Sequence, residues 1–162
     1  MRALIVALLI AVGTAPAAAA DGVFRTDVDR PMETVYPAVK SALEEAKFFV
    51  VFEANIGKNL ARFQERWGED YNRSDLAGIR SLVFCNGWYA NRVSNADPDM
   101  LALCPLRLTV VEKDGTSRIL FARPSRLAGD SPARGVLKEV ERDVIGAIRD
   151  GAEAARGQDG RP

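Results

Sequence analysis

The stretch LRLTVVEKDGTSRILFAR, residues 106–123, decides the fold, because local signals alone predict a β-hairpin there. Apolar and polar residues alternate from Leu106 to Glu112, which is typical of a strand with one buried face. Asp114-Gly115 follows, and this dipeptide favours the two-residue turn that joins antiparallel strands. The second strand runs from Arg118 to Arg123. An antiparallel pair is therefore expected late in the chain.

Three further strands are predicted upstream of the hairpin. Residues 23–28 alternate in the same way, and residues 79–85 are strand-like around an apolar centre. Residues 48–52 form an unbroken apolar run of β-branched and aromatic residues. This run predicts a central strand that is covered on both faces.

Apolar residues at three- and four-residue steps predict helices between and after these strands. Pro31 opens the first helix, where a missing N–H is tolerated. The last helix has the most regular period. The helices are expected at residues 31–46, 58–67, 88–95 and 136–148.

The order β-α-β-α-β-α-β-β-α has no repeat and no linker. It predicts a single α+β domain with helices packed on a mixed or antiparallel sheet of about five strands. We expect the domain to cover residues 21–151, with Gly151 ending the last helix. Residues 152–162 are expected to form a flexible tail.

The first twenty residues, MRALIVALLIAVGTAPAAAA, have the pattern of a cleaved signal peptide. Arg2 supplies a positive charge, an apolar run follows, and Ala18 and Ala20 stand at the −3 and −1 positions before Asp21. We therefore expect residues 1–20 to be removed and the protein to be periplasmic or secreted. The apolar run is too short to cross a bilayer, so no membrane span is expected after cleavage.

The composition excludes several classes of site. The chain has no histidine, which rules out Ser-His, Cys-His and His-metal arrangements. The glycine-rich motifs of dinucleotide and P-loop phosphate sites are absent. Removal of Arg2 leaves a formal charge of −1, and no basic stripe or Lys/Arg run is evident, so nucleic-acid binding is not expected. These absences favour a non-enzymatic protein.

Both cysteines lie in FCNGWYANRVSNADPDMLALCP, residues 84–105. In an exported chain, two cysteines eighteen residues apart favour a disulfide between Cys85 and Cys104. Two alternatives stay open. The pair could serve redox chemistry or bind Cu(I) together with the thioether of Met100, because copper(I) accepts sulfur ligands. The two thiols could instead be separate core residues.

The residues after Cys85 add a candidate pocket. The Asn86 amide and the Trp88-Tyr89 pair at a strand end could wall a ligand site. Packing of both aromatic rings into the core is the alternative that we favour for this pair.

The segments ALEEAKFFVVFEANIG, FCN and ADPDMLALCPLRLTVVEKDG resemble the domain-of-unknown-function 302 family. The resemblance covers about residues 23–148 and includes the Cys85-Asn86 and Asp97-Pro98 elements. Ala46-Lys47 departs from it, because the family has a glycine before Phe48. The resemblance implies a compact α+β domain that tends to form dimers, with no established activity. Family members without signal peptides carry similar cysteines, which implies that the cysteines share a cleft.

The sequence therefore predicts an exported, non-enzymatic homodimer that binds a small ligand or an exported protein partner. The expected cleft is lined by Cys85, Asn86, Tyr89 and Cys104. The alternative is a periplasmic thiol-redox or copper-handling protein that uses Cys85 and Cys104, and no cofactor other than copper is expected.

Overall fold

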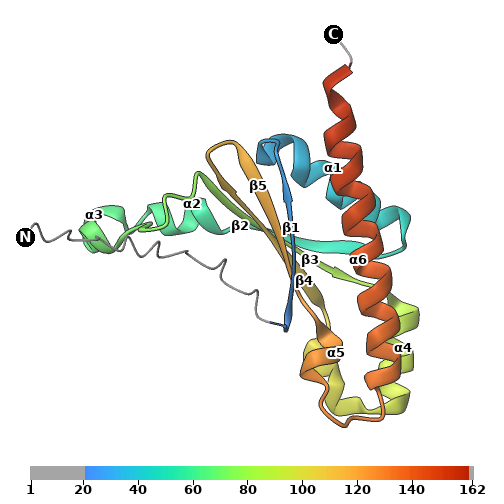
Figure 1. Cartoon of the computed structure of the whole chain (residues 1–162). Helices are drawn as coiled ribbons and strands as arrows, with labels where there is room; N and C mark the ends of the chain where they lie inside the picture. Colours follow the sequence, from blue (N-terminus) through green and yellow to red (C-terminus); the bar gives the residue numbers. More distant parts are fainter. Residues whose placement is uncertain (1–20, 161–162) are drawn as a thin grey trace, which may run out of the picture.

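A computed structural model describes residues 21–160, so the predicted signal peptide lies outside the described residues. Five strands form one antiparallel sheet in the order β1-β5-β4-β3-β2 (Figure 1). This confirms the predicted α+β class and sheet. The strands are β1 (Val23–Val28), β2 (Phe49–Asn55), β3 (Gly78–Cys85), β4 (Leu106–Lys113) and β5 (Thr116–Ala122).

The hairpin of β4 and β5 forms as predicted. Lys113 pairs with Thr116, so Asp114 and Gly115 make a two-residue turn. Both turn residues have positive φ, 52° at Asp114 and 75° at Gly115. Such a turn matches the twist of the two strands and requires residues that tolerate the left-handed region.

Two long helices, α1 (Met32–Glu45) and α6 (Arg134–Arg156), pack on each other and cover one face of the sheet (Figure 1). The short helices are α2 (Ile56–Ala61), α3 (Gln64–Trp67), α4 (Gly87–Ala96) and α5 (Pro124–Leu127), with 3₁₀ segments η1 (Gly68–Asp70), η2 (Pro98–Leu103) and η3 (Gly157–Gly160). Within residues 21–160, no helix is both long and apolar enough to span a membrane.

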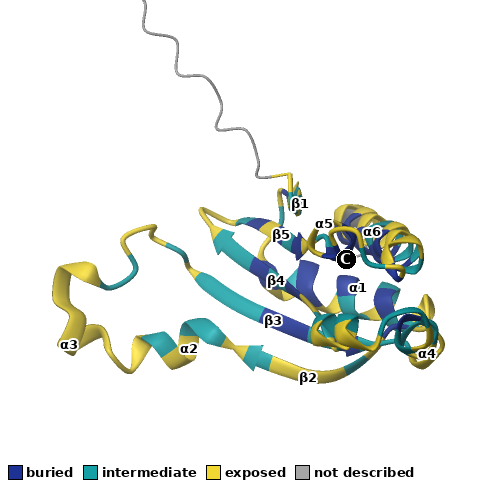
Figure 2. Cartoon of the chain, turned by 90° about the horizontal axis from the view of Figure 1, so that it is seen from below, coloured by how far each residue is buried: buried dark blue, intermediate teal, exposed yellow. Residues whose placement is uncertain are grey.

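The main core lies between the sheet and the two long helices (Figure 2). Alternate residues of the central strands point into it, and every second residue faces the other side, as the period of a strand requires. The fully buried apolar residues of the strands are Val28, Leu82, Phe84, Leu108, Val110, Ile119 and Phe121. A smaller cluster below it joins Val93 of α4 to Leu137 of α6.

The last helix is longer than predicted. It continues through Gly151 to Arg156, and η3 follows. The prediction that Gly151 ends the helix and that a tail starts at residue 152 was therefore wrong. Ala152 and Ala155 are buried in the main core, which explains why the helix continues.

The apolar run at residues 48–52 does not form a central strand. β2 is an edge strand, and Phe49, Val51 and Phe52 are 58%, 63% and 62% exposed. Only Phe48, just before the strand, is fully buried. The prediction of a strand covered on both faces was wrong, because sheet order depends on long-range pairing that local apolarity does not report.

The predicted helix at 58–67 is two short helices in a projecting segment. Residues 56–77, here called the arm, connect β2 to β3 and extend away from the body (Figures 1 and 2). Phe63 and Trp67 stack on each other with ring centroids 4.9 Å apart. They remain 41% and 40% exposed, so the predicted apolar face is not buried in the core.

Candidate functional site

The four predicted cleft residues line one cavity, but this cavity is very small. Cys85, Asn86, Tyr89 and Cys104 contribute to its wall together with core residues such as Phe48. Its volume is about 10 Å³. A single water needs about that much space, so the structure provides no open ligand cleft at this place.

The predicted disulfide is not formed. Cys85 and Cys104 are free, half-buried thiols that line the same small cavity without a bond between their sulfur atoms. The prediction of a disulfide between these two residues was therefore wrong. Burial raises the pKa of the Cys104 thiol, so this group stays protonated at neutral pH. A protonated thiol is a poor nucleophile and a poor metal ligand.

Met100 is not among the residues that line the cavity beside the two cysteines. Its side chain packs against the smaller cluster of α4 and α6, as a filler of irregular space. The three sulfur atoms proposed as copper ligands are thus not gathered around one cavity, and the copper alternative stays a prediction. Within residues 21–160, no group of three His, Cys, Asp or Glu side chains is arranged to hold a metal ion.

Asn86 serves the fold at the start of α4. Its Oδ1 accepts a hydrogen bond from the backbone N–H of Tyr89 at 3.1 Å, which caps the helix. Its Nδ2 donates to the carbonyl oxygen of Lys47 at 3.1 Å, which ties the α1–β2 turn to α4. The amide therefore already has backbone partners on both sides.

The two aromatic residues of α4, Trp88 and Tyr89, have different environments. Tyr89 stacks on Phe48 with centroids 6.0 Å apart, and its hydroxyl donates to Asp143 of α6 at 2.5 Å. That hydrogen bond raises the pKa of Tyr89. Trp88 points outward and is 68% exposed. The prediction that both rings pack into the core thus holds for Tyr89 and is wrong for Trp88.

A larger cavity, here called the arm pocket, lies where the arm meets the body. Its volume is about 530 Å³. The arm contributes one side and the start of β3 the other. The large apolar and aromatic side chains of the lining are Met32, Leu60, Trp67, Tyr71, Leu76 and Ile79.

Most polar side chains around the arm pocket already have partners. Asn55 caps α2 by accepting from the Lys58 N–H at 2.9 Å, and Asn72 bonds both backbone groups of Leu76 at 3.0 Å. The guanidinium of Arg80 lies 3.7 Å from the centre of the Tyr36 ring. In contrast, the ammonium group of Lys58 and the carboxylate of Glu33 make no ion pair within the described residues.

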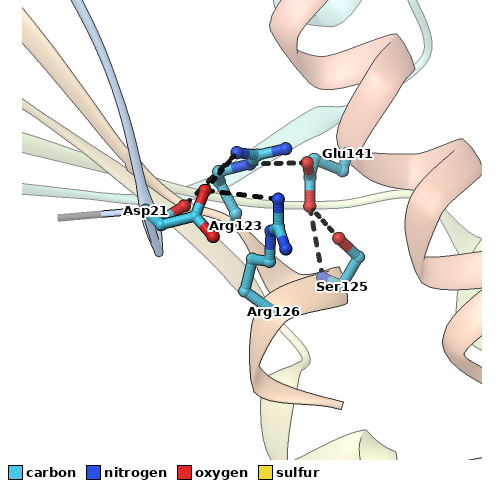
Figure 3. Close-up of polar contacts among 5 residues, drawn as sticks. All are labelled: Asp21, Arg123, Ser125, Arg126 and Glu141. Carbon is cyan, nitrogen blue, oxygen red and sulfur yellow. Dashed lines mark hydrogen bonds and ion pairs between the residues drawn. The ribbon is translucent and has the colours of Figure 1, made fainter. Parts of the chain in front are cut away.

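A third site joins Glu141 of α6 to residues in and just before α5 and to Asp21 (Figure 3). The carboxylate of Glu141, 6% exposed, accepts from Arg123 Nε at 2.7 Å and from Ser125 Oγ at 2.5 Å. Asp21 forms ion pairs with Arg123 at 3.4 Å and with Arg126 at 3.2 Å. These contacts fix α5 between the first strand and the last helix.

Burial and hydrogen bonding act on Glu141 in opposite directions. Burial alone would raise the pKa of this carboxyl group, because it penalises the charged form. The hydrogen bonds from Ser125 and Arg123 outweigh burial and hold the pKa below its ordinary value. Glu141 is thus an ionised, fully partnered carboxylate at neutral pH.

Sequence reasoning missed both of these sites. The arm pocket depends on how the arm sits beside the start of β3, where α2 contacts this strand, and no local pattern reports that arrangement. The basic side chains of α6 did leave a signal, because Arg134, Lys138 and Arg142 stand four residues apart and so share one helix face. The expectation that the chain has no basic stripe was wrong.

An antiparallel five-stranded sheet with two long helices on one face places the molecule among two-layer α+β proteins. The chain belongs to the DUF302 family, whose model, described as "Domain of unknown function DUF302", matches residues 24–151. This confirms the resemblance drawn from the sequence.

A solved structure has the same fold. It is titled "Crystal structure of uncharacterized conserved protein DUF302 from Bacillus stearothermophilus". The two chains are 22% identical, the match covers 81% of this chain and 98% of that one, and the TM-score is 0.70. No curated protein matches the chain.

Proposed function

We propose that this protein is an exported, non-enzymatic binding domain and that the arm pocket holds its small ligand. The observation that carries this proposal is the combination of volume and lining. Small-ligand sites in proteins commonly measure about 300–1,000 Å³ and combine apolar walls with a few polar groups. The arm pocket has such a volume, whereas the cavity beside the cysteines measures about 10 Å³.

The lining defines the kind of ligand. Trp67 and Tyr71 offer flat aromatic surfaces, and Met32 offers an adaptable thioether that fits irregular shapes. Lys58 is the cation without an ion pair at the rim. A small, largely apolar molecule with one anionic group matches these features.

The probe 8-anilinonaphthalene-1-sulfonate has this chemistry and reports on its own binding by fluorescence. We expect saturable binding to the purified protein. Ala61 lines the pocket from α2, so Ala61→Phe fills the space and should weaken binding about tenfold or more. The matched control is Ala154→Phe on the exposed side of α6, which should leave binding unchanged. Equal binding by the wild-type chain and Ala61→Phe would overturn the proposal.

We further propose that the domain functions as a homodimer that pairs through β2. The outer edge of this strand carries unpaired backbone groups, and Phe49, Val51 and Phe52 are exposed beside it. Proteins usually protect such edges with lysine, proline or unpaired charge. β2 contains neither lysine nor proline.

A second copy of the chain is the partner that fits this edge. The charge of Glu53, the one charged residue of β2, is already balanced by Lys40 at 2.6 Å and Arg80 at 3.6 Å. Two copies of β2 can therefore approach without charge repulsion. They would continue the antiparallel pairing used throughout the sheet and cover the same apolar side chains on each copy.

A further inference from the structure

A pocket at the opposite end of the molecule from the arm concentrates positive charge. The helix α5 lies beside the first half of α6 (Figure 1). The pocket that both helices line has a volume of about 290 Å³ and is here called the basic pocket. Besides Ser125 and Glu141, its lining consists of Arg123, Arg126, Arg134, Lys138 and Arg142.

The stripe on α6 is costly for the helix itself. Arg134, Lys138 and Arg142 are four residues apart, and like charges at this spacing repel. The first turn of α6 contains no acidic residue, and Ala133 provides no side-chain cap. Positive side chains near a helix N-terminus also oppose the helix dipole. Such unfavourable charge placements are expected at binding sites, because a bound anion offsets the repulsion between the positive side chains.

Two of these cations have no internal partner. Arg123 is engaged by Glu141, and Arg126 lies 3.2 Å from Asp21 (Figure 3). In the part of the chain that the structure describes, Arg134 and Lys138 make no ion pair. The pocket therefore presents the positive charges of Arg134 and Lys138, while the charge of its one acid, Glu141, is already balanced by Arg123.

We propose that the basic pocket binds a phosphate group. The guanidinium of Arg134 can bind two phosphate oxygens at once, and Lys138 adds a point charge. The pocket is large enough for a phosphate and a small attached group. Two sources share this chemistry, a soluble phosphate compound and the headgroup of an anionic lipid. Leu127 follows Arg126 in α5, and its side chain is 61% exposed. A lipid surface bound at the pocket would cover this apolar side chain.

The first test is a titration of the isotope-labelled protein with inorganic phosphate, followed by NMR at constant ionic strength with chloride as the control anion. Saturable shifts are expected at the amides of residues 123–142. Arg134→Gln/Lys138→Gln keeps good helix formers on exposed positions, and we expect it to lower the affinity about tenfold. The control Arg25→Gln/Arg107→Gln removes the same charge from exposed strand positions and should bind as the wild type does.

The second arm of the test identifies the source. The protein is mixed with vesicles of phosphatidylglycerol or of phosphatidylcholine and centrifuged. Retention by phosphatidylglycerol alone, lost in Arg134→Gln/Lys138→Gln, assigns the site to a lipid headgroup. Phosphate binding without retention assigns it to a soluble compound. If neither phosphate nor vesicles bind, or if the charge variant binds equally well, the proposal is wrong.

Discussion

Gly151 of α6 lies directly against Val39 of α1. A Cβ at position 151 would come within 2.7 Å of the Val39 Cα and 3.0 Å of the Ala38 carbonyl oxygen. Both are backbone atoms, so neither can move aside without separating the helices. This glycine therefore sets the distance between the two helices that cover the sheet.

The first prediction concerns this contact. Gly151→Ala should lower the free energy of unfolding by about 2 kcal/mol, because overpacking forces backbone shifts. Gly146→Ala, five residues earlier in the same helix, meets no atom within 4 Å and should raise stability by about 0.5–1 kcal/mol. Urea unfolding of the two variants measures the difference. Equal changes in both would show that the helices do not approach as closely as described.

Lys47 provides the second prediction. It adopts φ 67° directly after α1, where its N–H donates to the Glu44 carbonyl at 2.9 Å. Glycine is favoured at this kind of helix end, because the left-handed region strains residues with a Cβ. Lys47→Gly should therefore stabilise the protein by about 0.5–1 kcal/mol.

The control for Lys47→Gly is Lys138→Gly inside α6, which should cost about 1 kcal/mol. Thermal unfolding compares the two. A loss of stability in both variants would contradict the left-handed conformation of Lys47.

The third prediction concerns pH. The pKa of Glu141 is lower in the folded chain than its ordinary value, which is about 4.3 in an unfolded chain. As pH falls below about 4.3, the unfolded state takes up the proton first, and the stability contributed by Glu141 is lost as pH falls through the folded pKa. Glu141→Gln should cost about 2 kcal/mol at pH 7 and progressively less in acid.

Urea unfolding of wild type and Glu141→Gln between pH 3 and pH 7 checks this. Other carboxyl groups with lowered pKa, such as Asp27 and Glu53, are common to both chains and cancel in the difference. A difference that stays constant over this pH range would mean that Glu141 does not titrate as described.

The fourth prediction tests the dimer. Val51→Lys places a charge on the exposed edge of β2 and should convert a dimer into a monomer in sedimentation experiments. Val23→Lys places the same charge on the other edge strand, β1, which already carries Arg25 and Asp27. This control should remain dimeric. A monomeric wild-type chain, or a dimeric Val51→Lys, would refute pairing through β2.

Local patterns predicted those parts of the fold that local interactions determine. Asp114-Gly115 identified the hairpin because both turn positions need positive φ. Asp97-Pro98 marked the end of α4, because a residue before proline avoids the α region.

The wrong predictions concern features that depend on contacts between segments far apart in the sequence. The run from Phe48 to Phe52 looks like a buried strand, yet the sheet order β1-β5-β4-β3-β2 leaves β2 at an edge. Gly151 looked like a helix end, whereas its role comes from Val39, more than a hundred residues away in sequence. The candidate site failed for the same reason. Cys85 and Cys104 lie on either side of α4 and η2. The residues around each cysteine do not determine whether the two sulfur atoms can form a bond.

The accessibility of Trp67 tests the proposed ligand site most directly. In Trp88→Phe, Trp67 is the only tryptophan, and its ring lines the arm pocket. Quenching of its fluorescence by acrylamide should fall several-fold when 8-anilinonaphthalene-1-sulfonate saturates the protein, because the probe covers the ring. Unchanged quenching while the probe is bound would place the probe elsewhere and contradict the assignment of the arm pocket.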